Sequence, residues 1–417
     1  MAGTASPDCK NALSVRANMI WNSVGSITYF GCQWLITILV VRLSSGYDAA
    51  GTLSLAMSIY NIVSPLAVYR MYTYQVSDVN RENAVGEYFT FRLVTCAIAL
   101  FCCLVYAIPT CPLSALPAIV LYVVFKFCAL LIDILHGENQ LNGRMDYIGR
   151  SLMLQGVLTL LAFAIVLYFS SSLELAVVAM GAVTLFVGAV YDFPRTRQFG
   201  PIKIGISRKK ATYLLRHCFP IAIATVACSA TVSVPRQMLA AMGGEAALGI
   251  YSSVAAPVAI VQMGASYIYN PLLSVFAEQF IAGRIRDFAR TFVKVLIGIV
   301  CLGAVCAIGL ELLGPFLLGL MYGDSILPYC YLLLPMIALA ILTAFVWFAS
   351  DMLVVVRCFV GSFVGNFLAL LISACSCWWF ITQFDMNGVS FAAIAAYTCA
   401  SVLMVAILFW WIKKSRR

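Results

Sequence analysis

Hydrophobic positions in this chain form long runs and do not alternate with polar ones. Apolar stretches of about twenty residues recur from Trp21 to Trp411, separated by short polar segments. A helix rises about 1.5 Å per residue, so each stretch matches the ~30 Å hydrocarbon core of a bilayer. Strands of a membrane barrel would alternate apolar and polar residues over about ten positions, which these stretches do not. The pattern predicts an all-α integral membrane protein.

The stretches predict about twelve membrane-spanning helices. Their expected bounds are 17–41, 50–69, 88–109, 113–135, 150–169, 173–191, 215–235, 247–269, 293–314, 327–349, 355–381 and 388–411. The longest polar segment, 192–214, separates two sets of six. We therefore expect two six-helix lobes, residues 1–198 and 199–417. Six spans per lobe keep both lobes in the same orientation, so a pseudo-two-fold axis along the membrane normal should relate them.

A short internal repeat supports two related lobes. The segments AAGTLSLAMS (49–58) and ALGIYSSVAA (247–256) share three small residues, namely Ala49 with Ala247, Gly51 with Gly249 and Ser54 with Ser252. Each segment follows an arginine that ends the first span of its half, Arg42 or Arg236. Small residues shared by chance at helix starts would give the same match, so both explanations stand at this stage.

Composition narrows the class of protein. Hydrophobic residues make up 63% of the 417 positions and charged residues only 10%, against about 45–50% and 25% in soluble domains. Nearly all of the 16 cysteines lie within apolar stretches, where they act as small hydrophobic residues. The two histidines are isolated in the sequence, and no catalytic or nucleotide-binding motif occurs. We expect no enzyme activity, no cofactor and no metal site.

The basic residues predict the orientation of the chain, because cytoplasmic loops of membrane proteins are enriched in Lys and Arg. With the N-terminus inside, 23 of the 26 basic residues fall on the inner side. The net charge of +9 is therefore mostly a signal of topology and gives little support to a nucleic-acid partner. Both termini and 192–214 should be cytoplasmic, and the run at 208–210 can meet anionic membrane lipids.

Charged residues in or beside the spans are the candidates for function. Lys126 lies about 20 Å along its helix from the outer end of span 113–135. A charge there costs at least ~2.5 kcal/mol, so it should face protein or water. Asp133 lies about 20° from Lys126 around the same helix, so the two share a face. Arg42 and Arg236 lie at the outer boundary, and Glu311 lies in the outer half of span 293–314.

Each of these charges also has a purely structural explanation. Arg42 and Arg236 can extend to lipid headgroups from helix ends. Lys126 can pair with a carboxylate on another helix and fix packing only. Glu311 can have a structural role of the same kind.

Several segments resemble one family of membrane proteins. They are WNSVGSITYF with VVRLSSGYDAAGTLSLA, GENQLNGRMDYIGRS, PRQMLAAMGGEAALGIYSSVAAP and FLLGLMYGDSILPYCYLLLP. The chain resembles the Wzx-type flippases of lipid-linked oligosaccharides, in the multidrug/oligosaccharidyl-lipid/polysaccharide exporter (MOP) superfamily. Arg236 matches an arginine position of that family. The family commonly has an acidic residue just before it, and Pro235 departs from that pattern.

The resemblance implies two lobes around a central cavity that opens alternately to the two membrane faces. It implies a cytoplasmic-membrane flippase for an undecaprenyl-pyrophosphate-linked oligosaccharide in surface polysaccharide synthesis, as a monomer alongside polysaccharide polymerase machinery. Arg42, Lys126 and Arg236 would then bind the anionic substrate. Asp133, with Glu311 as second candidate, would exchange a coupling H⁺ or Na⁺.

Three alternatives stay open. A cation-coupled multidrug exporter of the same superfamily would typically carry a carboxylate deep in its first or seventh helix, and residues 17–41 and 215–235 contain none. A peptidoglycan-precursor flippase usually has more spans. A membrane scaffold without transport activity would show no ligand-dependent movement of its lobes.

Overall fold

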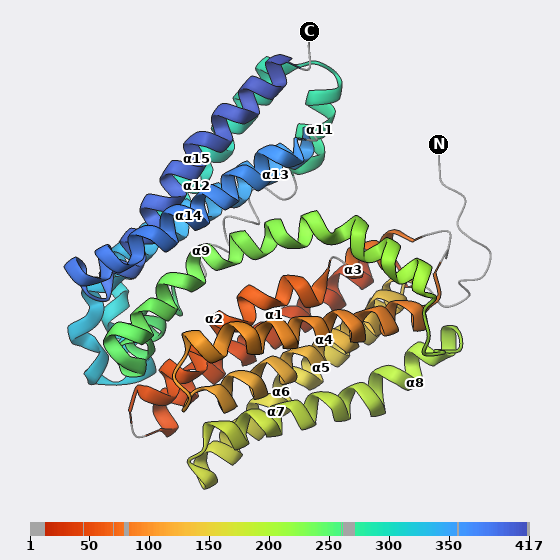
Figure 1. Cartoon of the computed structure of the whole chain (residues 1–417), viewed down its shortest axis with the longest axis horizontal. Helices are drawn as coiled ribbons and strands as arrows, with labels where there is room; N and C mark the ends of the chain where they lie inside the picture. Colours follow the sequence, from red (N-terminus) through yellow and green to blue (C-terminus); the bar gives the residue numbers. More distant parts are fainter. Residues whose placement is uncertain are drawn as a thin grey trace. The chain divides into compact units, whose positions relative to one another are not determined.

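The protein is helical throughout the part of the chain that the structure describes. This computed structural model describes residues 13–44, 46–69, 71–78, 83–259, 261, 272–356 and 358–414. Its helices are shown in Figure 1. Their bounds are α1 Val15–Leu43, α2 Asp48–Val68, α3 Met71–Ser77, α4 Val85–Thr110, α5 Leu116–Leu141, α6 Met145–Ser170, α7 Leu173–Val187, η1 Gly188–Asp192, α8 Phe193–Thr196, η2 Arg197–Phe199, α9 Arg208–Ala255, α11 Leu273–Ile281, α12 Ile285–Tyr322, η4 Asp324–Leu332, α13 Leu333–Val355, α14 Phe359–Phe384 and α15 Asn387–Lys414.

The expected spans correspond to these helices. Ten helices of the described chain are long and apolar enough to cross a membrane. The other two expected spans, 215–235 and 247–269, fall on α9 and the residues after it, and the second ends outside the described residues. α9 contains a break at Gly244, whose φ of 83° lies in the left-handed region that glycine tolerates best. α9 is therefore two helical segments, as the two separate spans predict.

The chain divides into two compact units. The first unit comprises Met1–Ser45 and Ile59–Ile223, and the second comprises Gly46–Ser58 and Ala224–Arg417. The start of α2 thus belongs to the second unit, and the first turns of α9 belong to the first. The lobe bounds expected from the sequence, 1–198 and 199–417, stay a prediction.

Glycines let helices of the first unit approach closely. α1 packs along α6, and a Cβ at Gly25 would lie 2.5 Å from the Cα of Gly149. Two turns later on α6, a Cβ at Gly156 would lie 3.0 Å from the Cα of Tyr29, which is one turn after Gly25 on α1. Small residues of this kind allow close backbone packing in membranes, where polar and van der Waals contacts drive association. The same close packing brings polar side chains of α1 and α6 together.

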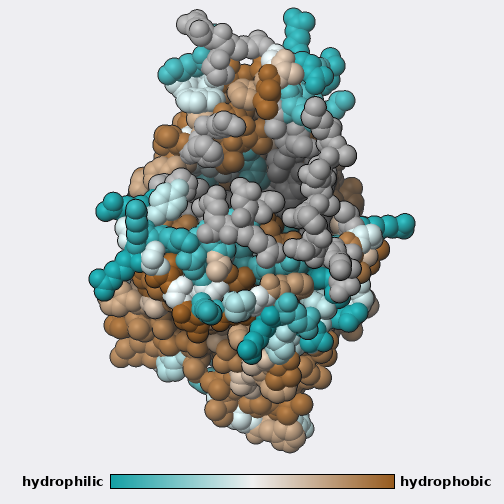
Figure 2. All heavy atoms as spheres, turned by 90° about the vertical axis from the view of Figure 1, so that its right-hand side faces the viewer, coloured by the Kyte–Doolittle hydropathy of each residue, from teal (hydrophilic) through white to brown (hydrophobic). Residues whose placement is uncertain are grey.

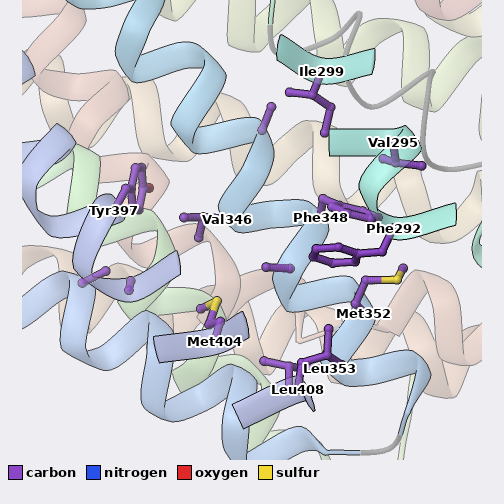
Figure 3. Close-up of a cluster of buried hydrophobic side chains, with 14 of the residues drawn as sticks. Phe292, Val295, Ile299, Val346, Phe348, Met352, Leu353, Tyr397, Met404 and Leu408 are labelled. Atoms are coloured by element: carbon purple, nitrogen blue, oxygen red, sulfur yellow. The ribbon is translucent and has the colours of Figure 1, made fainter. Parts of the chain in front are cut away.

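The second unit is built around an apolar cluster, part of which is shown in Figure 3. Phe292 and Phe348 stack there with ring centroids 5.0 Å apart. Phe276 meets Phe288 edge-on at 5.1 Å. These rings are buried among side chains of α11, α12 and α13, with α15 contributing Met404 and Leu408.

The G-x-x-x-G pair of α14 has the packing role that its spacing suggested. A Cβ at Gly361 would lie 2.7 Å from Ile407, and one at Gly365 would meet Met404, so both glycines face α15.

The two repeat segments pack directly against each other within the second unit. A Cβ at Gly51 would overlap the carbonyl oxygen of Glu245, and a Cβ at Gly249 would overlap that of Tyr47. Ser54 and Ser252 share a hydrogen bond between their hydroxyls. Tyr47 precedes Gly51 by the same four residues that separate Glu245 from Gly249, so the contact is self-complementary. This reciprocity favours a true repeat over a chance match of small residues.

Hydrophilic side chains gather at one end of the helices of the first unit. Figure 2 looks from the right-hand side of Figure 1, where α8 lies, and shows many hydrophilic side chains on this face with hydrophobic ones below them. Within the first unit, Lys210 of α9 pairs with Glu87 of α4 at 2.8 Å. Arg144, between α5 and α6, pairs with Asp146 at 2.8 Å. Its hydrogen bond to Asp146 raises the pKa of the Arg144 guanidinium above its ordinary value.

Candidate functional site: charged groups inside the first unit

Lys126 lies inside the first unit and is held by neutral groups. Its Nζ donates to the Gln33 side-chain oxygen at 3.1 Å. The ammonium also lies 4.9 Å from the ring centroid of Phe125 and 5.5 Å from that of Tyr122. Aromatic faces attract a cation, most strongly where water is excluded. Lys126 has no ion pair within the described chain, so its positive charge is not neutralised there.

A chain of polar residues leads from Lys126 to a buried carboxylate, and hydrogen bonds join its neighbouring members. Gln33 donates to Thr159 at 3.5 Å, and the Thr159 hydroxyl donates to the backbone oxygen of Gln155 at 2.5 Å. The Gln155 amide then donates to the Ser151 hydroxyl at 2.9 Å, and Ser151 donates to Asp192 at 2.7 Å. The Thr159 hydroxyl ends on the Gln155 backbone oxygen, and the next bond begins at the Gln155 side-chain amide, so two hydrogen-bonded stretches meet at this residue of α6. Within each stretch, a satisfied polar network holds its side chains in place.

His136 forms the far end of this chain. Its Nε2 lies 3.1 Å from Asp192 Oδ1, and Asp192 is fully buried where the π-helical turn η1 follows α7. In the sequence His136 is isolated, because its partner lies in a different helix. The structure supplies that partner.

Asp133 pairs with a buried arginine, Arg92, which is one of the 23 basic residues that the sequence assigns to the inner side. Arg92 Nη2 lies 3.6 Å from Asp133 Oδ2, and Arg92 Nη1 donates to the Ala67 carbonyl at 3.0 Å. The Arg92 side chain is fully buried, whereas the Asp133 side chain is 35% exposed. Arg92 Nε has no hydrogen-bond partner among the described residues. Arg92 lies inside the expected span 88–109, and this position in an apolar stretch could have identified it as a functional candidate from the sequence.

Of the other candidates, Arg42 belongs to the first unit, and Arg236 and Glu311 belong to the second. Arg42 is exposed in the last turn of α1, about 13 Å along the helix from Gln33. Arg236 lies in the second unit, about two turns before Gly244 in α9. Its guanidinium is 6.0 Å from the ring centroid of Tyr251. Glu311 is exposed on α12. A cavity shared by Arg42, Lys126 and Arg236 stays a prediction.

No protein-family model matches the chain. The capsular polysaccharide biosynthesis protein CapF of Staphylococcus aureus is 25% identical over 317 residues, which cover 74% of this chain and 77% of that protein. An inward-facing multidrug resistance MATE family transporter of the MOP superfamily matches with a TM-score of 0.71 and 13% identity, over 95% of this chain and 98% of that one. The chain has the fold of the MOP-superfamily transporters.

A second solved structure of this fold handles a lipid. The lipid II flippase MurJ, in an inward closed conformation, matches with a TM-score of 0.71 and 9% identity, over 93% of this chain and 87% of that one. The superfamily resemblance seen in the sequence is thus confirmed at the level of the fold. The prediction of a multi-pass all-α membrane protein is confirmed as well.

Proposed function

We propose that the protein flips a lipid-linked oligosaccharide, of the undecaprenyl-pyrophosphate type, across the cytoplasmic membrane by alternating access. The observation that carries this proposal is Lys126, a cation inside the bundle that meets an amide and two rings but no carboxylate among the described residues. A cation held this way attracts an anionic headgroup, because its charge is not already compensated. The pyrophosphate of the lipid carrier supplies that anion.

Two comparisons support a lipid-linked substrate. CapF takes part in capsular polysaccharide biosynthesis, and MurJ is a flippase of lipid II. Arg42 and Arg236 would extend the cationic surface met by the substrate. Polysaccharide polymerase machinery would receive the flipped product.

The rival function is a cation-coupled multidrug exporter. The fold alone agrees with it as well as with a flippase, because the MATE transporter and MurJ match with the same TM-score. A drug cation would need an acidic site. Neither α1 nor residues 215–235 of α9 contain Asp or Glu, and the fully buried charge facing Asp133 is the cation Arg92. These features favour an anionic substrate.

The decisive experiment measures flipping in reconstituted vesicles. A fluorescent undecaprenyl-pyrophosphate-linked sugar would be incorporated into both leaflets, and a membrane-impermeant quencher would report its movement. We expect flipping above the rate of protein-free vesicles. Efflux of cationic dyes without lipid flipping would instead establish the drug-exporter function.

The proposed orientation can be tested separately. Both chain ends, which include residues outside the described ranges, would be cytoplasmic, as would segment 192–214. In a cysteine-free background, an impermeant thiol reagent added outside should label a cysteine at position 324 and miss one at position 205. The reverse pattern would overturn the orientation without bearing on the substrate.

Coupling to an ion is proposed for Asp133, with Glu311 as the second candidate. Asp133 is part-exposed on the helix that carries Lys126, so an anionic substrate that engages Lys126 would change how tightly Asp133 holds a cation. Flipping would be measured with and without an imposed pH or Na⁺ gradient, in the natural protein and in Asp133→Asn and Glu311→Gln. Equal rates throughout would mean that both carboxylates are structural and that transport follows the substrate gradient.

A further inference from the structure

A groove on the first unit has the shape and chemistry of a lipid site. It encloses about 550 Å³ between α4, α9 and the end of α2. Ile98 and Cys102 line it from α4, and Phe219 and Ile223 line it from α9. Residues three or four positions apart share a helix face, so each wall is a stripe about 10 Å long.

The floor of the groove offers hydrocarbon and no uncommitted polar group. Thr95 and Tyr69 lie there and are buried. The Thr95 hydroxyl donates to the Ala67 carbonyl at 2.8 Å, and the Tyr69 hydroxyl donates to the Leu215 carbonyl at 2.9 Å. The mouth is open, since Ile98 is 42% exposed and Phe219 is 53% exposed.

A single cation marks one end of the groove. Arg216 is exposed and has no hydrogen bond or ion pair with any other residue that the structure describes. It stands where the basic start of α9, from Arg208 to Lys210, gives way to the apolar span 215–235. The groove therefore runs from the expected membrane interface into the hydrocarbon region.

We propose that this groove binds one acyl chain of an anionic phospholipid, with the lipid phosphate on Arg216. A guanidinium matches a phosphate through paired hydrogen bonds. The groove has one cation and no uncommitted polar group on its floor, so it suits a single phosphate better than a pyrophosphate-linked sugar. The occupant is thus a lipid of the surrounding leaflet and distinct from the proposed transport substrate.

The test measures lipids retained by the purified full-length protein with native mass spectrometry. Phosphatidylglycerol and phosphatidylcholine with identical acyl chains would compete, and polyprenyl phosphate would form a third arm. We expect retention of phosphatidylglycerol over phosphatidylcholine. Arg216→Gln should reduce that preference about fivefold, which corresponds to the ~1 kcal/mol per basic residue near an anionic surface.

Groove-filling variants test the acyl-chain contact. Ile98→Trp should lower retention of both phospholipids, and Cys102→Leu is a milder variant in case the first does not fold. Arg290→Gln, on the exposed surface of α12 in the second unit, is the matched control and should change neither.

Three results would overturn the proposal. The first is unchanged retention after both groove-filling variants, and the second is an unchanged preference in Arg216→Gln. The third is stronger retention of polyprenyl phosphate than of phosphatidylglycerol, which would assign the groove to the transported carrier. Because retention is measured without flipping, these results are independent of the transport assay.

Discussion

The two units bury different kinds of side chain. Among the described residues, every buried charged side chain belongs to the first unit, namely Arg92, His136, Glu138, Asp146 and Asp192. The buried polar groups of the second unit are hydroxyls and amides, such as Ser362 and Asn366, and its main cluster is aromatic and aliphatic. Charge within a membrane is costly and is kept where it has a use. The first unit therefore holds the buried charges, whereas the groups that the second unit buries serve mainly packing.

Loss of the Lys126 charge should have the largest effect on transport. We expect Lys126→Ala to lower flipping to the rate of protein-free vesicles while the amount of protein in the membrane stays near normal. The same outcome is expected for Arg42→Ala and Arg236→Ala if they line the cavity. Lys294→Ala, an exposed lysine of α12, is the control. Near-normal flipping in Lys126→Ala would show that the buried cation of the first unit is not needed to bind the substrate.

Truncation in the aromatic cluster should instead affect stability. Phe348 is fully buried and contacts Phe276 and Phe292. We expect Phe348→Ala to cost about 3–5 kcal/mol of unfolding free energy, as for other buried Phe residues. Phe316→Ala removes a ring that is 68% exposed in the same unit and should cost much less. Thermal unfolding and flipping per folded molecule would be compared, and a loss of flipping without a loss of stability would contradict the packing role.

The contact between the repeat segments leaves no room for a Cβ atom at either glycine. We expect Gly51→Ala to destabilise the protein by about 3 kcal/mol, at the upper end of overpacking costs, because its Cβ would meet backbone that cannot move aside locally. Gly31→Ala is the matched control, since nothing lies within 4 Å of the added Cβ. Equal thermal stability of the two variants would show that the segments do not pack as closely as described.

A smaller effect is expected from breaking the hydrogen-bond chain far from Lys126. Ser151→Ala removes the partner of both Asp192 and Gln155, and an unsatisfied buried group costs about 1–3 kcal/mol. If the chain positions Lys126, the substrate concentration for half-maximal flipping should rise about fivefold to tenfold. Ser170→Ala, exposed at the end of the same helix, is the control. A change in stability alone would assign the chain to packing.

The sequence identified the spans and a cation within one of them, but not the partners of its charged residues. Lys126 stands out because it interrupts an apolar stretch, which is a local property. Asp133 was correctly placed on the helix that carries Lys126, yet its observed partner is Arg92 of α4. The repeat at Gly51 and Gly249 was visible as a match of small residues, whereas the backbone contact between them was not.

The sequence by itself determined that this is a helical membrane protein, because hydrocarbon leaves backbone groups no partners except those within a helix. That constraint acts on each stretch of about twenty residues separately, so it can be read locally. Only the tertiary structure decided that Lys126 meets Gln33, that His136 meets Asp192 and that the charged groups gather in the first unit. These contacts join residues 93 and 56 positions apart. They depend on how each helix is rotated against its neighbours, which is set by side-chain packing between helices and not by the sequence of either one alone.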